Sequence, residues 1–69
     1  MSYQRRKVMK ALADRGYVLL REGSRHTMVG KPGERGEPVP RHDEINRITM
    51  RRIAKNLGLD WASFEAEIR

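Results

Sequence analysis

The sequence contains no cysteine and only two histidines, and this scarcity excludes several kinds of chemistry. Without cysteine the chain has no disulfide bond, no thiolate nucleophile and no cysteine-ligated zinc site. Two histidines without a carboxylate cluster also make a poor metal site. We therefore expect a protein that works without a metal ion or another cofactor.

Long hydrophobic segments are absent as well. No apolar run approaches the roughly 18 residues of a membrane-spanning helix, and no signal-peptide pattern opens the chain, so we expect a cytoplasmic protein without membrane contact. The 69 residues make one domain, over 1–69. A chain this short buries only about 60% of the surface that its unfolded form exposes. Any site should therefore be a shallow surface groove.

Positive charge is what the chain has in excess. Lys and Arg number 15 against 9 Asp and Glu, which gives a net charge of +6, and eleven of the fifteen are arginine. The planar guanidinium matches phosphate oxygens and stacks on bases, whereas lysine acts mainly as a point charge. A nucleic acid is therefore the first partner to expect. An acidic protein surface, or a charged surface that only keeps the protein in solution, remains an alternative.

The first segment predicts a helix over Ser2–Arg15. Val8, Met9 and Leu12 recur at helical spacing, and Gly16 follows where a helix-ending glycine belongs. One face of this helix is basic and carries Arg6, Lys7 and Lys10.

A β-hairpin is predicted next. Two β-favouring runs, Tyr17–Glu22 and His26–Lys31, flank a short glycine-containing turn. His26 would be the first residue of the returning strand, on rigid backbone beside a mobile turn. Alternation places His26 and Met28 on one face and Val29 on the other, and the pattern leaves open which face is buried.

The rest of the chain predicts one weak strand and two helices. Pro38–Pro40 should lie at a sheet edge because its prolines lack N–H donors, and a polar loop follows over Arg41–Asn46. A helix over Ile48–Leu57 has Thr49 as a plausible cap, and Gly58 ends it. The exposed side of this helix carries Arg51, Arg52 and Lys55.

A short last helix should be capped by Asp60 and carry Trp61, Phe64 and Ile68 at spacings of three and four. The predicted fold is therefore α+β, an αβββα chain with a short extra C-terminal helix, in which helices cover one face of the sheet. The expected core consists of Val8, Leu12, Leu19, Ile53 and Leu57.

Four pieces of the sequence together resemble a known family. They are Gly16-Tyr17, Gly23-Ser24-Arg25-His26, Val39-Pro40-Arg41-His42 and the helix from Thr49 to Gly58. In this order, over roughly residues 3 to 64, the chain resembles the HicA (YcfA-like) toxins of bacterial type II toxin–antitoxin systems. The resemblance implies a fold like that of double-stranded-RNA-binding domains. It also implies a ribosome-independent endoribonuclease, an mRNA interferase, that a HicB-type antitoxin inhibits.

The resemblance implies a catalytic role for His26. In the family the histidine directly follows a Gly-Ser or Gly-Gly pair, whereas here Arg25 stands between Ser24 and His26 and extends the loop by one residue. The chemistry agrees, because the RNA 2′-OH needs a base that works near neutral pH, and histidine has a usual pKa of about 6.5. His42 is a possible general acid, and Lys31 or Arg25 could hold the phosphate.

The predicted RNA-binding residues are Arg25, Lys31, Arg41, Arg6, Lys7, Lys10, Arg51, Arg52 and Lys55. The two basic helix faces and the hairpin are expected to form one groove. A small RNA-binding module without catalysis would share all these charges but would not need His26. An adaptor that binds an acidic protein is the third possibility, and the steep salt dependence of RNA binding distinguishes it from the other two.

Overall fold

The computed structural model describes the whole chain, residues 1–69, and divides it into eight elements. In chain order they are β1 (Ser2–Gln4), α1 (Arg5–Asp14), β2 (Val18–Glu22), β3 (His26–Gly30), β4 (Glu37–Pro40), β5 (Glu44–Asn46), α2 (Arg47–Leu57) and α3 (Trp61–Ile68).

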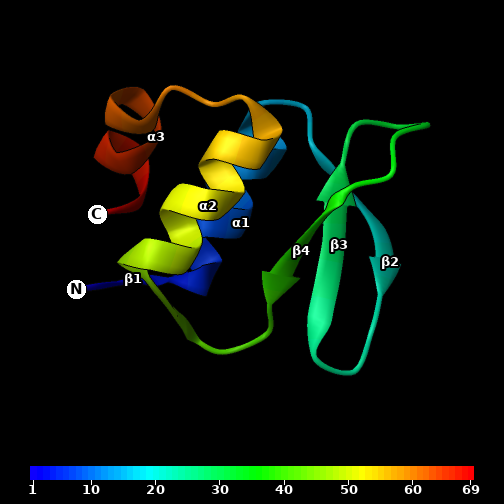
Figure 1. Cartoon of the computed structure of the whole chain (residues 1–69), viewed down its shortest axis with the longest axis horizontal. Helices are drawn as coiled ribbons and strands as arrows, with labels where there is room; N and C mark the ends of the chain where they lie inside the picture. The colour runs from blue at the N-terminus through cyan, green and yellow to red at the C-terminus, as the bar shows by residue number, and fades with distance from the viewer.

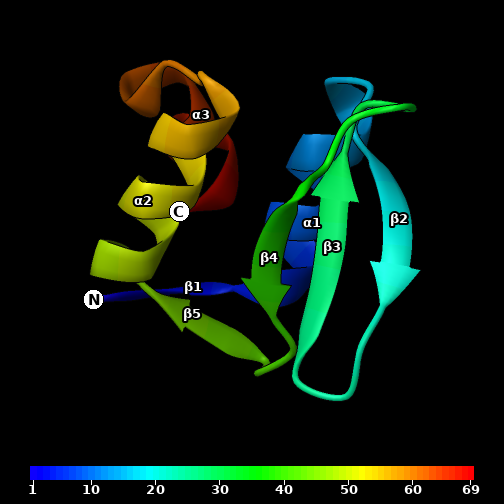
Figure 2. The same cartoon turned by 45° about the vertical axis from the view of Figure 1, so that its right-hand side comes forward.

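The main sheet is antiparallel with the strand order β2-β3-β4, and the helices lie on one side of it (Figure 1). α3 packs against α1 and α2. The two short strands β1 and β5 pair with each other beside this layer (Figure 2). The predicted α+β fold, αβββα with an extra C-terminal helix, is confirmed by the succession of α1, β2, β3, β4, α2 and α3. No helix is long and apolar enough to cross a membrane.

The prediction was wrong for the first three residues of the expected helix, Ser2–Gln4, where the structure has the strand β1 instead of a helical turn. Tyr3 is 2% exposed and lies opposite Ile45, which is buried to the same extent. The Tyr3 hydroxyl donates a hydrogen bond to Glu65 Oε2 at 2.8 Å, and burial raises the pKa of this phenol. Helical periodicity could not show this pairing because the partner strand is about forty residues away in the sequence.

The polar loop predicted over Arg41–Asn46 was also partly wrong, because its last three residues form β5. Asn46 then caps α2: its side-chain oxygen accepts a hydrogen bond from the Thr49 N–H at 2.8 Å. Thr49 is therefore not the cap, and the helix begins one residue earlier than predicted, at Arg47. An asparagine is a stronger cap than a threonine, which explains the shift.

The C-terminal end of α2 and the N-terminal end of α3 follow the prediction. Gly58 has φ +75°, the left-handed conformation that a glycine adopts without strain, and the Leu59 N–H returns to the Ala54 carbonyl at 2.8 Å. The Asp60 carboxylate accepts a hydrogen bond from the Ser63 N–H at 3.1 Å, and this bond lowers the pKa of the carboxyl.

The core lies between the helices and the inner face of the sheet. Val8, Leu12 and Ile53 are fully buried as predicted, and Leu57 packs partly against them. Leu19 was predicted to be in the core but is 53% exposed, because β2 is an edge strand. The structure also shows which face of β3 is buried. Thr27 and Val29 lie on the buried face, so His26 and Met28 point outward.

Candidate functional site

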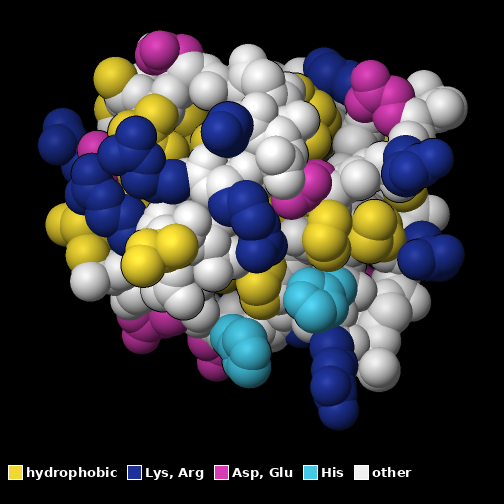
Figure 3. All heavy atoms as spheres, in the orientation of Figure 1, with side chains coloured by type: hydrophobic (Ala, Val, Ile, Leu, Met, Phe, Trp, Pro, Cys, Tyr) yellow, Lys and Arg dark blue, Asp and Glu magenta, His cyan; other side chains and the backbone are white.

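The two histidines come together at the lower end of the sheet. His26 is the first residue of β3 and lies opposite Pro40, the last residue of β4; His42 follows two residues later, in the loop to β5. Both side chains are exposed and border one groove with a volume of about 720 Å³. In the space-filling view they lie side by side (Figure 3). Two imidazoles in one open groove can supply both a proton acceptor and a proton donor.

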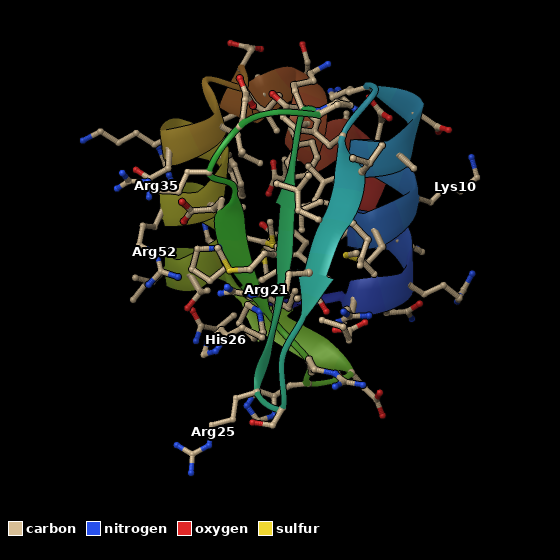
Figure 4. The ribbon with its side chains drawn as sticks, turned by 90° about the vertical axis from the view of Figure 1, so that its right-hand side faces the viewer. Lys10, Arg21, Arg25, His26, Arg35 and Arg52 are labelled. Atoms are coloured by element: carbon tan, nitrogen blue, oxygen red, sulfur yellow. The ribbon has the colours of Figure 1, made fainter.

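The turn before β3 accommodates the extra residue Arg25. The Gly23 N–H donates a hydrogen bond to the His26 carbonyl at 2.8 Å, and the Arg41 N–H donates to the Arg25 carbonyl at 3.2 Å. Arg25 lies at the tip of the hairpin and extends into solvent without a hydrogen bond or an ion pair from its guanidinium (Figure 4). The extension therefore places a free positive charge beside the groove and leaves His26 at the first position of the strand.

The opposite wall of the groove is formed by β5 and the first turn of α2. Glu44, Ile45 and Asn46 of β5 and Thr49 of α2 line it, together with the loop that carries His42. The N-terminal end of a helix bears a partial positive charge, which favours an anion in the groove. No group of three or more His, Cys, Asp or Glu side chains is arranged to hold a metal ion.

Arg41 joins the two segments that carry the histidines. Its Nη1 donates a hydrogen bond to the Gly23 carbonyl at 2.7 Å, and its Nε lies 3.6 Å from Glu22 Oε1. The loop of His42 is thereby fixed to the turn of His26. The predicted phosphate contact from Arg41 would compete with these two bonds.

A second set of contacts joins the strands next to the groove, and the sequence analysis did not predict it. Arg5 donates from Nε to the Pro40 carbonyl at 3.0 Å and from Nη2 to Thr27 Oγ1 at 2.7 Å. The Thr27 hydroxyl in turn donates to Glu22, and Thr27 is 0% exposed. We call Arg5, Glu22, Thr27 and Arg41 the clamp. The only sequence feature that could have indicated the clamp is Thr27, a hydroxyl residue next to His26 on the face of β3 that also carries Val29.

Lys31 is not brought to the histidines. It follows the far end of β3, five residues from His26, which corresponds to about 16 Å of extended strand. Its Nζ donates to the Arg15 carbonyl at 2.6 Å and lies 4.6 Å from the centre of the Tyr17 ring. Lys31 and His26 therefore cannot hold the same phosphate.

The expected single groove between the two basic helix faces does not exist. Lys10 on α1 and Arg52 on α2 point to opposite sides of the molecule (Figure 4). The α1 cations also have partners: Arg6 donates to Gln4, Lys7 to the Arg69 carbonyl, and Lys10 pairs with Asp14 at 3.0 Å.

On α2 the three predicted cations differ in their surroundings. Arg51 lies 5.3 Å from the centre of the Trp61 ring, and Arg52 is 3.9 Å from Glu37. Lys55 is exposed and makes no ion pair.

Fold and groove together define a small basic α+β protein whose two histidines share an open surface site. The comparison with family models gives a match over residues 5–59 to the HicA toxin of bacterial toxin–antitoxin systems. The match spans most of the chain, and the protein belongs to the HicA toxin family. It is the toxin component of a toxin–antitoxin system, which implies an antitoxin as partner. Comparisons with curated proteins and with solved structures each found no match.

Proposed function

We propose that this toxin is an endoribonuclease that cleaves mRNA without a metal ion. The observation that carries the proposal is the groove shared by His26 and His42, with the unpaired Arg25 beside it, in a member of the HicA toxin family. RNA supplies its own nucleophile, the 2′-OH, so the protein needs to supply only proton transfer and positive charge.

In the proposed reaction His26 takes the proton of the 2′-OH as the 2′-oxygen attacks the adjacent phosphorus. The negative charge that develops on the phosphorane is met by the guanidinium of Arg25 and by the N-terminal end of α2. The bond from phosphorus to the 5′-oxygen then breaks, and His42 donates a proton to this leaving oxygen. The products are a 2′,3′-cyclic phosphate and a free 5′-OH.

The partner would be a HicB-type antitoxin. The groove is open and the protein carries a net charge of +6, so we expect an acidic inhibitor that covers the hairpin of His26. Such a surface would exclude RNA both sterically and by charge.

Expression and cleavage together test this function. Expression of the toxin alone should arrest growth, and co-expression with the neighbouring antitoxin gene should restore growth and yield a co-purifying complex. The purified toxin should cleave RNA in excess chelator as fast as in magnesium, because no step needs a divalent ion. Cleavage that disappears in chelator would contradict the metal-free mechanism. RNA binding with no cleavage under any condition would favour a non-catalytic RNA-binding module.

A further inference from the structure

The outer face of the main sheet, which faces away from the helices, has an unusual composition. On β3 it presents His26, Met28 and Gly30, and on β4 it presents Pro38 and Pro40, which lie opposite Met28 and His26. No carboxylate belongs to this face, because Glu22 and Glu37 lie opposite Thr27 and Val29 on the inner face. The outer face is therefore apolar and free of negative charge up to the position of His26.

A β-bulge in β2 adds an arginine to this face. Leu19 lies opposite Val29, but Arg21 lies opposite Met28, so Leu20 is an extra residue in the strand. Without the extra residue, alternation would turn Arg21 toward the same side as Leu19. The bulge instead brings Arg21 to the outer face beside Met28, two residues along β3 from His26.

Three of the four arginines around the outer face have no partner. Arg21, Arg25 and Arg35 are exposed and form no side-chain hydrogen bond or ion pair, and Arg52 has only the long 3.9 Å contact with Glu37. Figure 4 shows these four arginines and His26 on the sheet side and along the α2 flank of the molecule, away from Lys10. On the α1 flank the charges are paired: Lys10 with Asp14, and Arg15 with Glu67 at 2.5 Å.

A hollow of about 300 Å³ lies on this face. Its walls include Arg21, Arg25 and His26, and its apolar lining is formed by Met28 and Pro38. Arg25 and His26 also border the groove that holds His42. A strand of RNA that crosses the ridge at His26 would therefore occupy the groove on one side and the hollow on the other.

We propose that the outer sheet face is the binding track for single-stranded RNA. The bases next to the cleaved bond pack on Met28 and Pro38, and the phosphates that follow pair with Arg21, Arg52 and Arg35. A single strand is specified because a duplex keeps its bases stacked inside, where this apolar surface does not reach them. RNA fits this face better than an acidic protein does. The unpaired arginines can bind phosphates, the apolar surface of Met28 and Pro38 can hold bases, and this surface ends at His26.

The inference rests on the proposed ribonuclease only for the position of the cleaved phosphate, at His26. Two triple variants of matched charge test the track. The track variant is Arg21→Ala/Arg35→Ala/Arg52→Ala, and the control is Arg6→Ala/Lys7→Ala/Lys10→Ala. Binding of labelled single-stranded RNA, and of the same RNA annealed to its complement, is measured at several salt concentrations with His26→Ala present in all proteins.

The track variant should flatten the plot of log affinity against log salt by about two units, because each lost single-strand phosphate contact removes about 0.7. The control should keep the slope of the parent, because its three side chains, although predicted from the sequence to bind RNA, already have partners within the protein. The duplex should bind more weakly than the single strand. In proteins that retain His26, the track variant should raise KM for RNA and leave kcat within about threefold.

An equal or larger loss of slope in the control would overturn the track, as would equal or tighter binding of the duplex. If the track variant still cleaves RNA and its salt slope is unchanged, the inferred track is wrong and the proposed ribonuclease function is unaffected. If the slope is flattened but the parent protein never cleaves RNA, the ribonuclease function is wrong and the track is supported. If the track variant binds RNA normally but loses the antitoxin, the face is a protein interface and the inference is wrong.

Discussion

The His26→Ala protein is expected to bind RNA as tightly as the parent and to cleave it roughly 100-fold to 10,000-fold more slowly, the usual contribution of a general base. His26 is exposed at the end of a strand and belongs to no part of the core. Its replacement should therefore change the free energy of unfolding by no more than about 0.5 kcal/mol. Single-turnover cleavage rates in chelator, RNA affinity and thermal unfolding are measured on the same preparations.

His42→Ala is the matched comparison. His42 is exposed like His26 and borders the same groove, but it lies in a loop and has the later role in the proposed reaction. Its loss should slow cleavage by roughly tenfold to 100-fold, since the leaving oxygen can still take a proton from water. Cleavage by the His26→Ala protein would disprove the assignment of His26 as the general base. Growth arrest by His26→Ala would disprove the role of His26 in toxicity.

Thr27→Val should lower both stability and activity, although Thr27 does not reach the groove. The change keeps the shape of the side chain and removes the hydroxyl that joins Arg5 to Glu22. A buried polar group left without its partner costs about 1–3 kcal/mol. The clamp also fixes the turn of His26 to the loop of His42, so kcat should fall by roughly tenfold to 100-fold, the cost of about 1 Å of misplacement.

Thr27→Ser provides the control, because it retains the hydroxyl and loses only a methyl group. Kinetics measured well below the unfolding temperature separate positioning from simple loss of folded protein. A positioning role lowers kcat with KM nearly unchanged, whereas a purely structural role lowers only the fraction of active enzyme. Wild-type kcat in fully folded Thr27→Val would show that the clamp does not position the histidines.

Elements that depend on local sequence could be predicted, and those that depend on distant partners could not. The hairpin before His26 and the glycine end of α2 follow from turn and cap preferences within a few residues. The pairing of Tyr3 with Ile45 joins segments that are distant in the sequence. Nothing in the alternation of either segment identifies the other as its partner.

The candidate site shows the same division. His26 and His42 could be identified as residues, but their common groove depends on Arg41 reaching back to Gly23. Arg21 was not among the predicted RNA contacts, because strict alternation hides the bulge at Leu20 that turns it outward. Lys31 was included because the predicted strand ran from His26 to Lys31, and the length of β3 separates the two residues.

The chemistry of the cut ends tests the central claim most directly, because it reports which oxygen attacked the phosphorus. RNA is incubated with the purified toxin in excess chelator, and the fragments are identified by mass spectrometry. The same RNA with 2′-O-methyl groups throughout is treated in parallel. We expect fragments with a 2′,3′-cyclic phosphate or its hydrolysed 3′-phosphate, partner fragments with a 5′-OH, and no cleavage of the methylated copy. Fragments with a 5′-phosphate and a 3′-OH, or cleavage of the methylated RNA, would show that water is the nucleophile and would contradict the mechanism based on His26.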